Sequence, residues 1–167
     1  MKPRLIVGLF LGCLTAGGAA RPGEAPEPMP PKDLVALTAE AESALADLQM
    51  RYLENNPKLQ EQIERVRELR RLKSAGSREP LVLQLARVDL AVMQVHFLSE
   101  HPLLKEQAES VSAMERQWRA DAGTPEVLLE ALGQLAAMRV HYGEQHPRMR
   151  ELAEQIAALE AKAATRP

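Results

Sequence analysis

The chain has 167 residues, of which 46% are hydrophobic, 26% charged and only 3% aromatic, and its formal net charge is −2. That length and hydrophobicity suit one soluble domain or one short repeat array, and the balanced charge gives no indication of general nucleic-acid binding, which needs a basic surface. Leu, Ala, Val and Met supply most of the apolar residues, and alternating Val/Ile stretches typical of strands are missing, so an all-α fold is predicted.

The first 20 residues have the pattern of an export signal. Lys2 and Arg4 precede an apolar stretch, residues 5–14, which is shorter than the ~20 residues that a membrane-spanning helix needs. Small residues follow, and they suit cleavage after Ala20. In an alternative interpretation, residues 9–13, LFLGC, resemble a bacterial lipoprotein box, so that the signal ends before Cys13 and Cys13 becomes the lipidated first residue. An uncleaved anchor is the third alternative.

These patterns predict an exported protein, either periplasmic or lipid-anchored to a bacterial cell envelope. Cys13 is the only cysteine, so no disulfide is expected in the folded part. Residues 21–33 contain five prolines, which exclude a helix and indicate an extended spacer. The helical domain is then expected to occupy residues 34–167.

A repeat of 45 residues is the strongest signal in the sequence. Three segments align without a gap: YLENNPKLQEQIERVREL from Tyr52, FLSEHPLLKEQAESVSAM from Phe97, and YGEQHPRMRELAEQIAAL from Tyr142. Each contains an aromatic residue five positions before a proline, and the apolar residues upstream and downstream also recur at a spacing of 45 residues. A fixed period of this length indicates stacked supersecondary units. We place the repeats at about residues 34–76, 77–121 and 122–164.

Each repeat is predicted to be a hairpin of two helices. Leu45, Leu48 and Tyr52 share one helical face before the proline, and Leu59, Val66 and Leu69 share one after it. Proline ends a helix because it disfavours helical geometry in the preceding residue, whereas it is tolerated at the first position of the next helix. The expected helices are residues 34–55, 57–74, 80–100, 102–120, 125–145 and 147–164, with Asp33, Ser77 and Thr124 as N-caps. Three such hairpins stack as a short α-solenoid or bundle. The alternative is that each proline only kinks one long helix.

The turn of the third repeat resembles a known envelope family. Residues 142–147, YGEQHP, followed by Leu152 and by residues 155–159, QIAAL, are similar to a stretch in the periplasmic helices of polysaccharide chain-length determinant proteins, where a Tyr…His-Pro turn also joins helical segments. This chain lacks that family's two membrane spans and carries the motif three times. The resemblance implies the same way of turning between envelope helices.

The four histidines are the candidate metal ligands. They are His96, His101, His141 and His146, and they form two pairs at equivalent positions of the second and third repeats. Histidine is the commonest metal ligand, but no cysteine or acidic cluster completes a structural zinc set, so the pattern favours polar residues at helix ends over a metal site.

No other feature of the sequence indicates catalysis. The recurring acids Glu61, Glu106 and Glu151 suit the first turns of helices, where the helix dipole is positive. Residues 64–73, ERVRELRRLK, are typical of a solvated helix face; the functional alternative is contact with an anionic partner such as a lipid headgroup or an acidic polysaccharide. Nucleophile, phosphate-loop and metalloprotease motifs are missing. We therefore expect no catalytic residue, no cofactor and no enzyme.

The sequence favours a non-enzymatic interaction or scaffold protein of the bacterial cell envelope. Its expected partner is another protein or a second copy of the chain, with membrane contact only through a lipid anchor at Cys13 and no nucleic acid. The alternative is a periplasmic helical chaperone or a metal-responsive protein, because of the paired histidines and the seven methionines.

Overall fold

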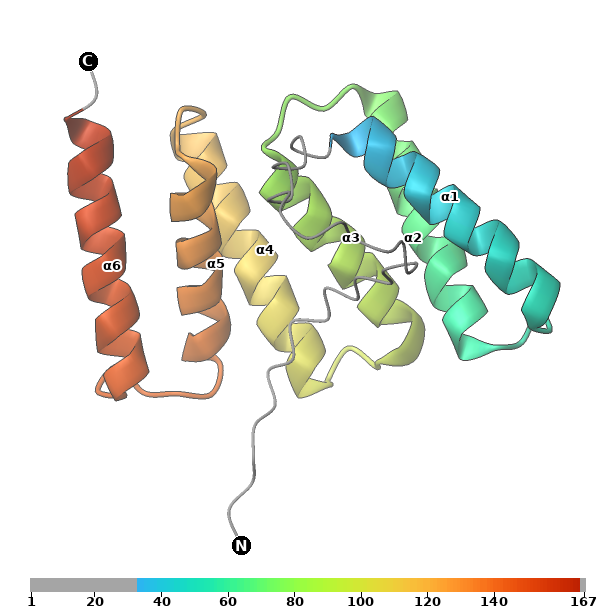
Figure 1. Ribbon diagram of the computed structural model, residues 1–167. Coiled ribbons are helices and arrows are strands. Elements are labelled where there is room, and N and C mark those ends of the chain that lie inside the picture. Colours follow the sequence, from blue (N-terminus) through green and yellow to red (C-terminus); the bar gives the residue numbers. More distant parts are fainter. Residues whose placement is uncertain (1–32, 166–167) are drawn as a thin grey trace, which may run out of the picture. The chain divides into compact units, whose positions relative to one another are not determined.

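The computed structural model describes residues 33–165, and within them the protein is all-helical, with six helices and no strand. The predicted export signal, Cys13 and the spacer up to residue 32 lie outside the described residues. The helices are α1 (Leu34–Arg51), α2 (Pro57–Ala75), α3 (Leu81–His96), α4 (Pro102–Ala120), α5 (Glu126–Arg139) and α6 (Pro147–Ala164), shown in Figure 1.

Three prolines set the starts of every second helix. Pro57, Pro102 and Pro147 are the first residues of α2, α4 and α6, as predicted, because the missing N–H of proline is not needed there. The preceding helices end earlier than expected, at Arg51, His96 and Arg139 instead of residues 55, 100 and 145. The longer prediction was wrong because reversing the chain takes five to seven non-helical residues before each proline.

The starts of α1, α3 and α5 and the end of α2 depend on other residues. Asp33 caps α1 as predicted, and its Oδ1 accepts a hydrogen bond from the Ala36 N–H at 2.7 Å. Ser77 and Thr124 do not cap helices: α3 and α5 follow Pro80 and Pro125, whose extended backbone precedes the first helical residue without a side-chain cap. Gly76 ends α2 in the left-handed conformation, with φ of 58°, which glycine adopts without strain.

Consecutive helices pack against each other along the whole described part of the chain. Contacts join α1 to α2, α2 to α3, α3 to α4, α4 to α5 and α5 to α6, and α3 also contacts α5. Each proline therefore starts a new helix that returns along the previous one, instead of kinking a continuous helix. Because the connections are short, the turns at residues 52–56, 97–101 and 140–146 lie at one end of the helices, and those at 76–80 and 121–125 lie at the other (Figure 1). We call the first of these the turn end.

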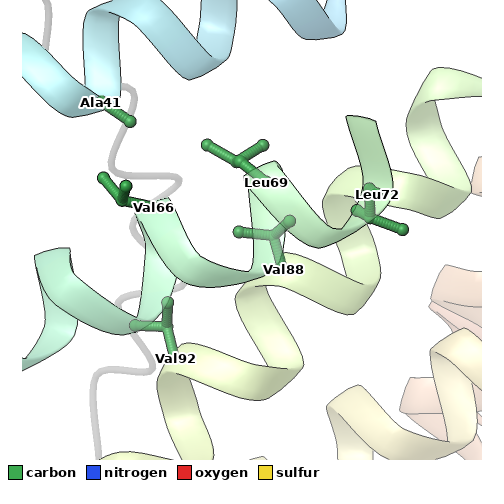
Figure 2. Packing of buried hydrophobic residues seen from close by; sticks show 6 residues of the cluster. All are labelled: Ala41, Val66, Leu69, Leu72, Val88 and Val92. Atoms are coloured by element: carbon green, nitrogen blue, oxygen red, sulfur yellow. The ribbon is translucent and has the colours of Figure 1, made fainter. Parts of the chain in front are cut away.

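The first core cluster joins α1, α2 and α3. Figure 2 shows Ala41 of α1 and Val88 and Val92 of α3 directed toward Val66, Leu69 and Leu72 of α2. Leu72 and Val88 are almost completely buried. Burying a Val or Leu side chain contributes about 1.5–3 kcal/mol, so this cluster accounts for the packing of α3 on the preceding pair of helices.

Two further clusters continue the core toward the C-terminus. Leu83, Val111, Met114 and Leu129 form the second, against which Trp118 packs as a partly buried side chain. Leu128, Ala131 and Ile156 form the third. Gly133 of α5 lies against α4: a Cβ there would lie 2.7 Å from Ser110 Oγ and 2.9 Å from Met114 Cε. The absence of a side chain at this position lets the two helices approach.

Candidate functional site

Two of the four histidines bridge helices in the same way. His96, the last residue of α3, places Nε2 2.9 Å from Glu61 Oε1 of α2. His141, just after α5, makes the corresponding contact with Glu106 of α4. In both pairs the glutamate precedes the histidine by 35 residues. The contacts therefore join α3 to α2 and the end of α5 to α4, and the sequence analysis did not pair these residues.

The other two histidines belong to the turns. His101 is the N-cap of α4, where its Nδ1 accepts a hydrogen bond from the Leu103 N–H at 3.3 Å, and its ring stacks on Phe97 with the ring centres 4.0 Å apart. His146 is the N-cap residue of α6 and its ring lies 4.3 Å from that of Tyr142. These positions match the expectation of histidines at helix ends.

The candidate metal ligands do not converge in the described part of the chain. His96 and His141 each meet a single glutamate, whereas His101 and His146 face aromatic rings. No group of three or more His, Cys, Asp or Glu residues among residues 33–165 is placed to hold a metal ion.

The basic segment of α2 is extensively paired with acids. Arg65 contacts Asp89 of α3 at 3.3 Å, Arg70 contacts Glu42 of α1 at 2.7 Å, and Arg71 holds Glu68 one turn earlier in α2. The hydrogen bond from Arg71 lowers the pKa of Glu68 in spite of the opposing effect of burial. At Asp89 burial has the larger effect and raises the pKa of the carboxyl, which Arg65 only partly offsets. Arg65 and Arg70 therefore join α2 to its neighbouring helices, which agrees with a structural role for the segment.

Arg87 is the centre of a second ion-pair group. Its guanidinium binds both carboxylate oxygens of Glu79 and donates from Nε to Glu115 Oε1 of α4 at 2.9 Å. Arg87 is only 23% exposed. Desolvation works against its charge, but the two carboxylates outweigh that effect and raise the pKa of Arg87. Through Arg87, the group joins the segment before α3 to α3 and α4.

The exposed apolar side chains are concentrated at the turn end. Seven of the ten large hydrophobic residues that are exposed in the described part of the chain lie in or beside its three turns. They are Met50, Tyr52, Leu53, Val95, Leu98, Leu103 and Val140. Met50, Val95 and Val140 are spaced by 45 residues, as are Leu53 and Leu98, which are 81% and 84% exposed. These exposed apolar side chains therefore gather at one end of the helices.

Charges of both signs surround these residues. Residues 50–60, 95–105 and 140–150 together carry five basic and three acidic side chains, a net charge of +2, and the acid Glu100 is held by Lys105 at 2.5 Å. The remaining described residues carry eleven basic and eighteen acidic side chains, a net charge of −7. Glu61 and Glu106, the next acids along α2 and α4, are engaged by His96 and His141. The three turns themselves contain Glu54, Glu100 and Glu144 and no Lys or Arg, and Glu151 directly follows Arg150, so the charge at the turn end is mixed.

Two hollows of the structure lie away from the turn end. One of about 400 Å³ lies between the start of α5 and the ends of α4 and α6, lined by Gln117, Thr124 and Glu160 among others. Another of about 480 Å³ lies between α1 and α2, with Leu45 and Ile63 beside Arg67 and Arg70. Both are shallow and open, and the first contains no histidine or nucleophilic cysteine.

Comparison of the chain with protein-family models, with curated proteins and with solved structures found no match. Among the described helices, none combines the length and the apolar character needed to cross a membrane.

Proposed function

We propose that this chain is a non-enzymatic interaction or scaffold protein of the bacterial cell envelope, and that it binds its partner through the turn end. The observation that carries the proposal is the concentration of exposed apolar side chains there. The fold does not require them: Leu53 and Leu98 belong to none of the core clusters. Apolar surface left in water is unfavourable, so a partner that covers it gains free energy on binding.

An envelope location rests on the N-terminal sequence. Lys2 and Arg4, the apolar residues 5–14 and the small residues that follow form an export signal, and the proline-rich residues 21–33 form a spacer between that signal and the helices. The protein is then periplasmic after cleavage near Ala20, or attached to the envelope through a lipidated Cys13.

We propose that the three hairpins form a short α-solenoid. Equivalent contacts at a spacing of 45 residues support this arrangement. Gln62 Nε2 donates to the Ala41 carbonyl at 2.8 Å and Gln107 Nε2 to the Ala86 carbonyl at 3.0 Å, in each case within one hairpin. The two His–Glu contacts recur between hairpins. A solenoid places equivalent turns along one edge, which makes that edge an extended binding surface.

The proposal is tested by capture from envelope extract with cross-linking. The bait variant is Leu53→Ser/Leu98→Ser, and the matched control is Val35→Ser/Val127→Ser, which changes two exposed apolar residues away from the turn end. We expect a defined envelope component to be captured by the wild type and the control and lost with the turn-end variant. Equal capture by all three proteins would contradict a function through the turn end.

The apolar turn end also favours one alternative, a periplasmic chaperone that holds unfolded clients on the same side chains. Suppression of aggregation of an unfolded model protein, lost in Leu53→Ser/Leu98→Ser, would support it over a specific scaffold. A metal-responsive role would instead require micromolar zinc or copper binding by calorimetry that is lost in His96→Ala/His141→Ala.

A further inference from the structure

We infer that copies of this chain associate head to tail, with α6 of one copy packed on α1 of the next. The inference rests on the repeat arrangement proposed above. It adds an interface that is separate from the turn end, and the partner at this interface is a second copy of the chain.

The two joints between consecutive hairpins are built alike. In the first joint α3 packs on α2, and His96 contacts Glu61 at 2.9 Å. In the second joint α5 packs on α4, and His141 contacts Glu106. Both members of the second contact lie 45 residues after their counterparts in the first. Equivalent positions of the repeat therefore meet across both joints.

The same two positions carry opposite charges at the two ends of the chain of hairpins. Arg51 lies 45 residues before His96 and is the last residue of α1, as His96 is the last residue of α3. Glu151 lies 45 residues after Glu106, near the start of α6. Both side chains are exposed. A contact between Glu151 of one copy and Arg51 of the next would continue the series, with an arginine in place of the histidine.

A second pair of positions has the same property. Leu72 of α2 and Leu85 of α3 belong to the core cluster of the first joint. The equivalent position in α6 holds Lys162, and the equivalent position in α1 holds Glu40. Opposite charges therefore stand at both ends of the proposed interface, and together they fix its register and its direction.

The rest of these two helix faces is small and polar. Ser43 of α1 is the equivalent of Gly133, the residue at which α5 approaches α4 closely. Ala158 of α6 lies between Glu151 and Lys162 on the same face, three and four residues from its polar neighbours Gln155 and Lys162. Small side chains permit close approach, whereas terminal repeats with polar outer faces remain soluble. We therefore expect a weak and reversible association.

The two faces differ from each other, so the interface is heterologous. Each added copy leaves one α1 face and one α6 face exposed at the ends of the assembly. An interface of this kind produces open arrays when its rotation does not close a ring. The association is therefore expected to continue beyond a dimer as the protein concentration rises.

The test is sedimentation velocity of the purified mature protein at concentrations up to about 1 mM, where weak contacts become populated. The variants are Arg51→Glu, Glu151→Arg and the double reversal Arg51→Glu/Glu151→Arg. The matched control is Arg116→Glu, which changes the charge of an exposed arginine in α4 of the middle hairpin. All proteins are recovered in the same processed form, as checked by intact mass, and circular dichroism establishes that they are folded.

We expect the wild type and the control to form species larger than a dimer. Each single reversal brings like charges together and should weaken association about tenfold or more, whereas the double reversal should restore it to within about threefold of the wild type. A wild type that stays monomeric, an association that stops at a dimer, or a double reversal no better than the single ones would overturn the inference. Capture through the turn end is measured with other variants, so its outcome decides the proposed function independently.

Discussion

Arg87 of α3 and Glu115 of α4 form a bridge of 2.9 Å whose charges are exchanged 45 residues earlier, where Glu42 of α1 binds Arg70 of α2 at 2.7 Å. Arg87 belongs to the first helix of its hairpin, whereas Arg70 belongs to the second helix of its hairpin. This pair of equivalent positions therefore forms a salt bridge between the two helices of a hairpin, whichever helix carries the arginine. The bridges differ in burial, because Arg87 is 23% exposed and Arg70 is 63% exposed.

That difference predicts unequal costs for the two arginines. Arg87→Ala leaves Glu79 and Glu115 without their main partner and should lower the free energy of unfolding by about 1–3 kcal/mol. Arg70→Ala removes a bridge open to solvent and should cost less than about 1 kcal/mol. Urea unfolding of both variants measures the difference. Equal losses of unfolding free energy would show that burial does not determine how much each bridge stabilises the protein.

Truncation of Phe97 should destabilise the protein much more than truncation of its neighbour Leu98. Phe97 stacks on His101 across the turn and is partly buried, so Phe97→Ala should destabilise the protein by about 1–3 kcal/mol, less than the ~3–5 kcal/mol of a fully buried Phe. Leu98→Ala should change stability by less than about 0.5 kcal/mol. Urea unfolding at several protein concentrations checks both values. A loss for Phe97→Ala that disappears at high concentration would indicate an intermolecular role for the ring.

Gly133 should not tolerate the side chain present 45 residues earlier. Position 88 holds a buried Val in α3, but Gly133→Val in α5 would force Ser110 and Met114 to move and should cost about 1–3 kcal/mol. Gly143→Ala is the control, since a Cβ there meets no atom within 4 Å. Thermal unfolding compares the two, and a Gly133→Val protein as stable as the control would mean that α4 and α5 can separate freely.

The ion pair of Glu68 predicts a contribution to acid stability. Its pKa in the folded protein is lowered from 4.5, chiefly by the hydrogen bond from Arg71, so the carboxylate stabilises the fold above pH 4.5 and this contribution is lost as the pH falls through the folded pKa. The difference in unfolding free energy between wild type and Glu68→Gln should therefore shrink as the pH is lowered from about 5 through the folded pKa of Glu68. Its size should stay below about 1 kcal/mol because Arg71 is solvated. A difference that is constant over this range would exclude the mechanism.

Export predicts a defined change of mass. A chain that begins after Ala20 is expected for soluble export, and a chain that begins at an acylated Cys13 for a lipoprotein. Intact-mass measurement on protein from the envelope fraction distinguishes the two forms. Full-length protein recovered from the cytoplasm would contradict both.

The helix starts were predictable because they depend on local chemistry. Pro57, Pro102 and Pro147 act through their own rings, so their effect is the same in any surroundings. The helix ends were not predictable in this way. The extended backbone of Tyr52 and Phe97 belongs to a reversal that is completed by packing of the next helix, and no residue before them breaks a helix.

The contacts of the site required the tertiary structure. Glu61 lies 35 residues from His96, and only the packing of α3 on α2 brings the two together. The recurrence of the same spacing at Glu106 and His141 was present in the repeat and could have suggested the pairs. The exposure of Leu53 and Leu98 could not be predicted from their apolar character, because Phe97, which is also apolar and adjacent to Leu98, is partly buried.

The glutamine contacts of the first two hairpins have a consequence for the order in which the protein opens. Gln62 and Gln107 each reach a backbone carbonyl of the neighbouring helix and so resist sliding of one helix along the other. The third hairpin has Leu152 at this position, and α6 packs chiefly on α5. Its backbone amides should therefore exchange with solvent deuterium before those of α2 and α4, and unfolding should begin at the C-terminal helix.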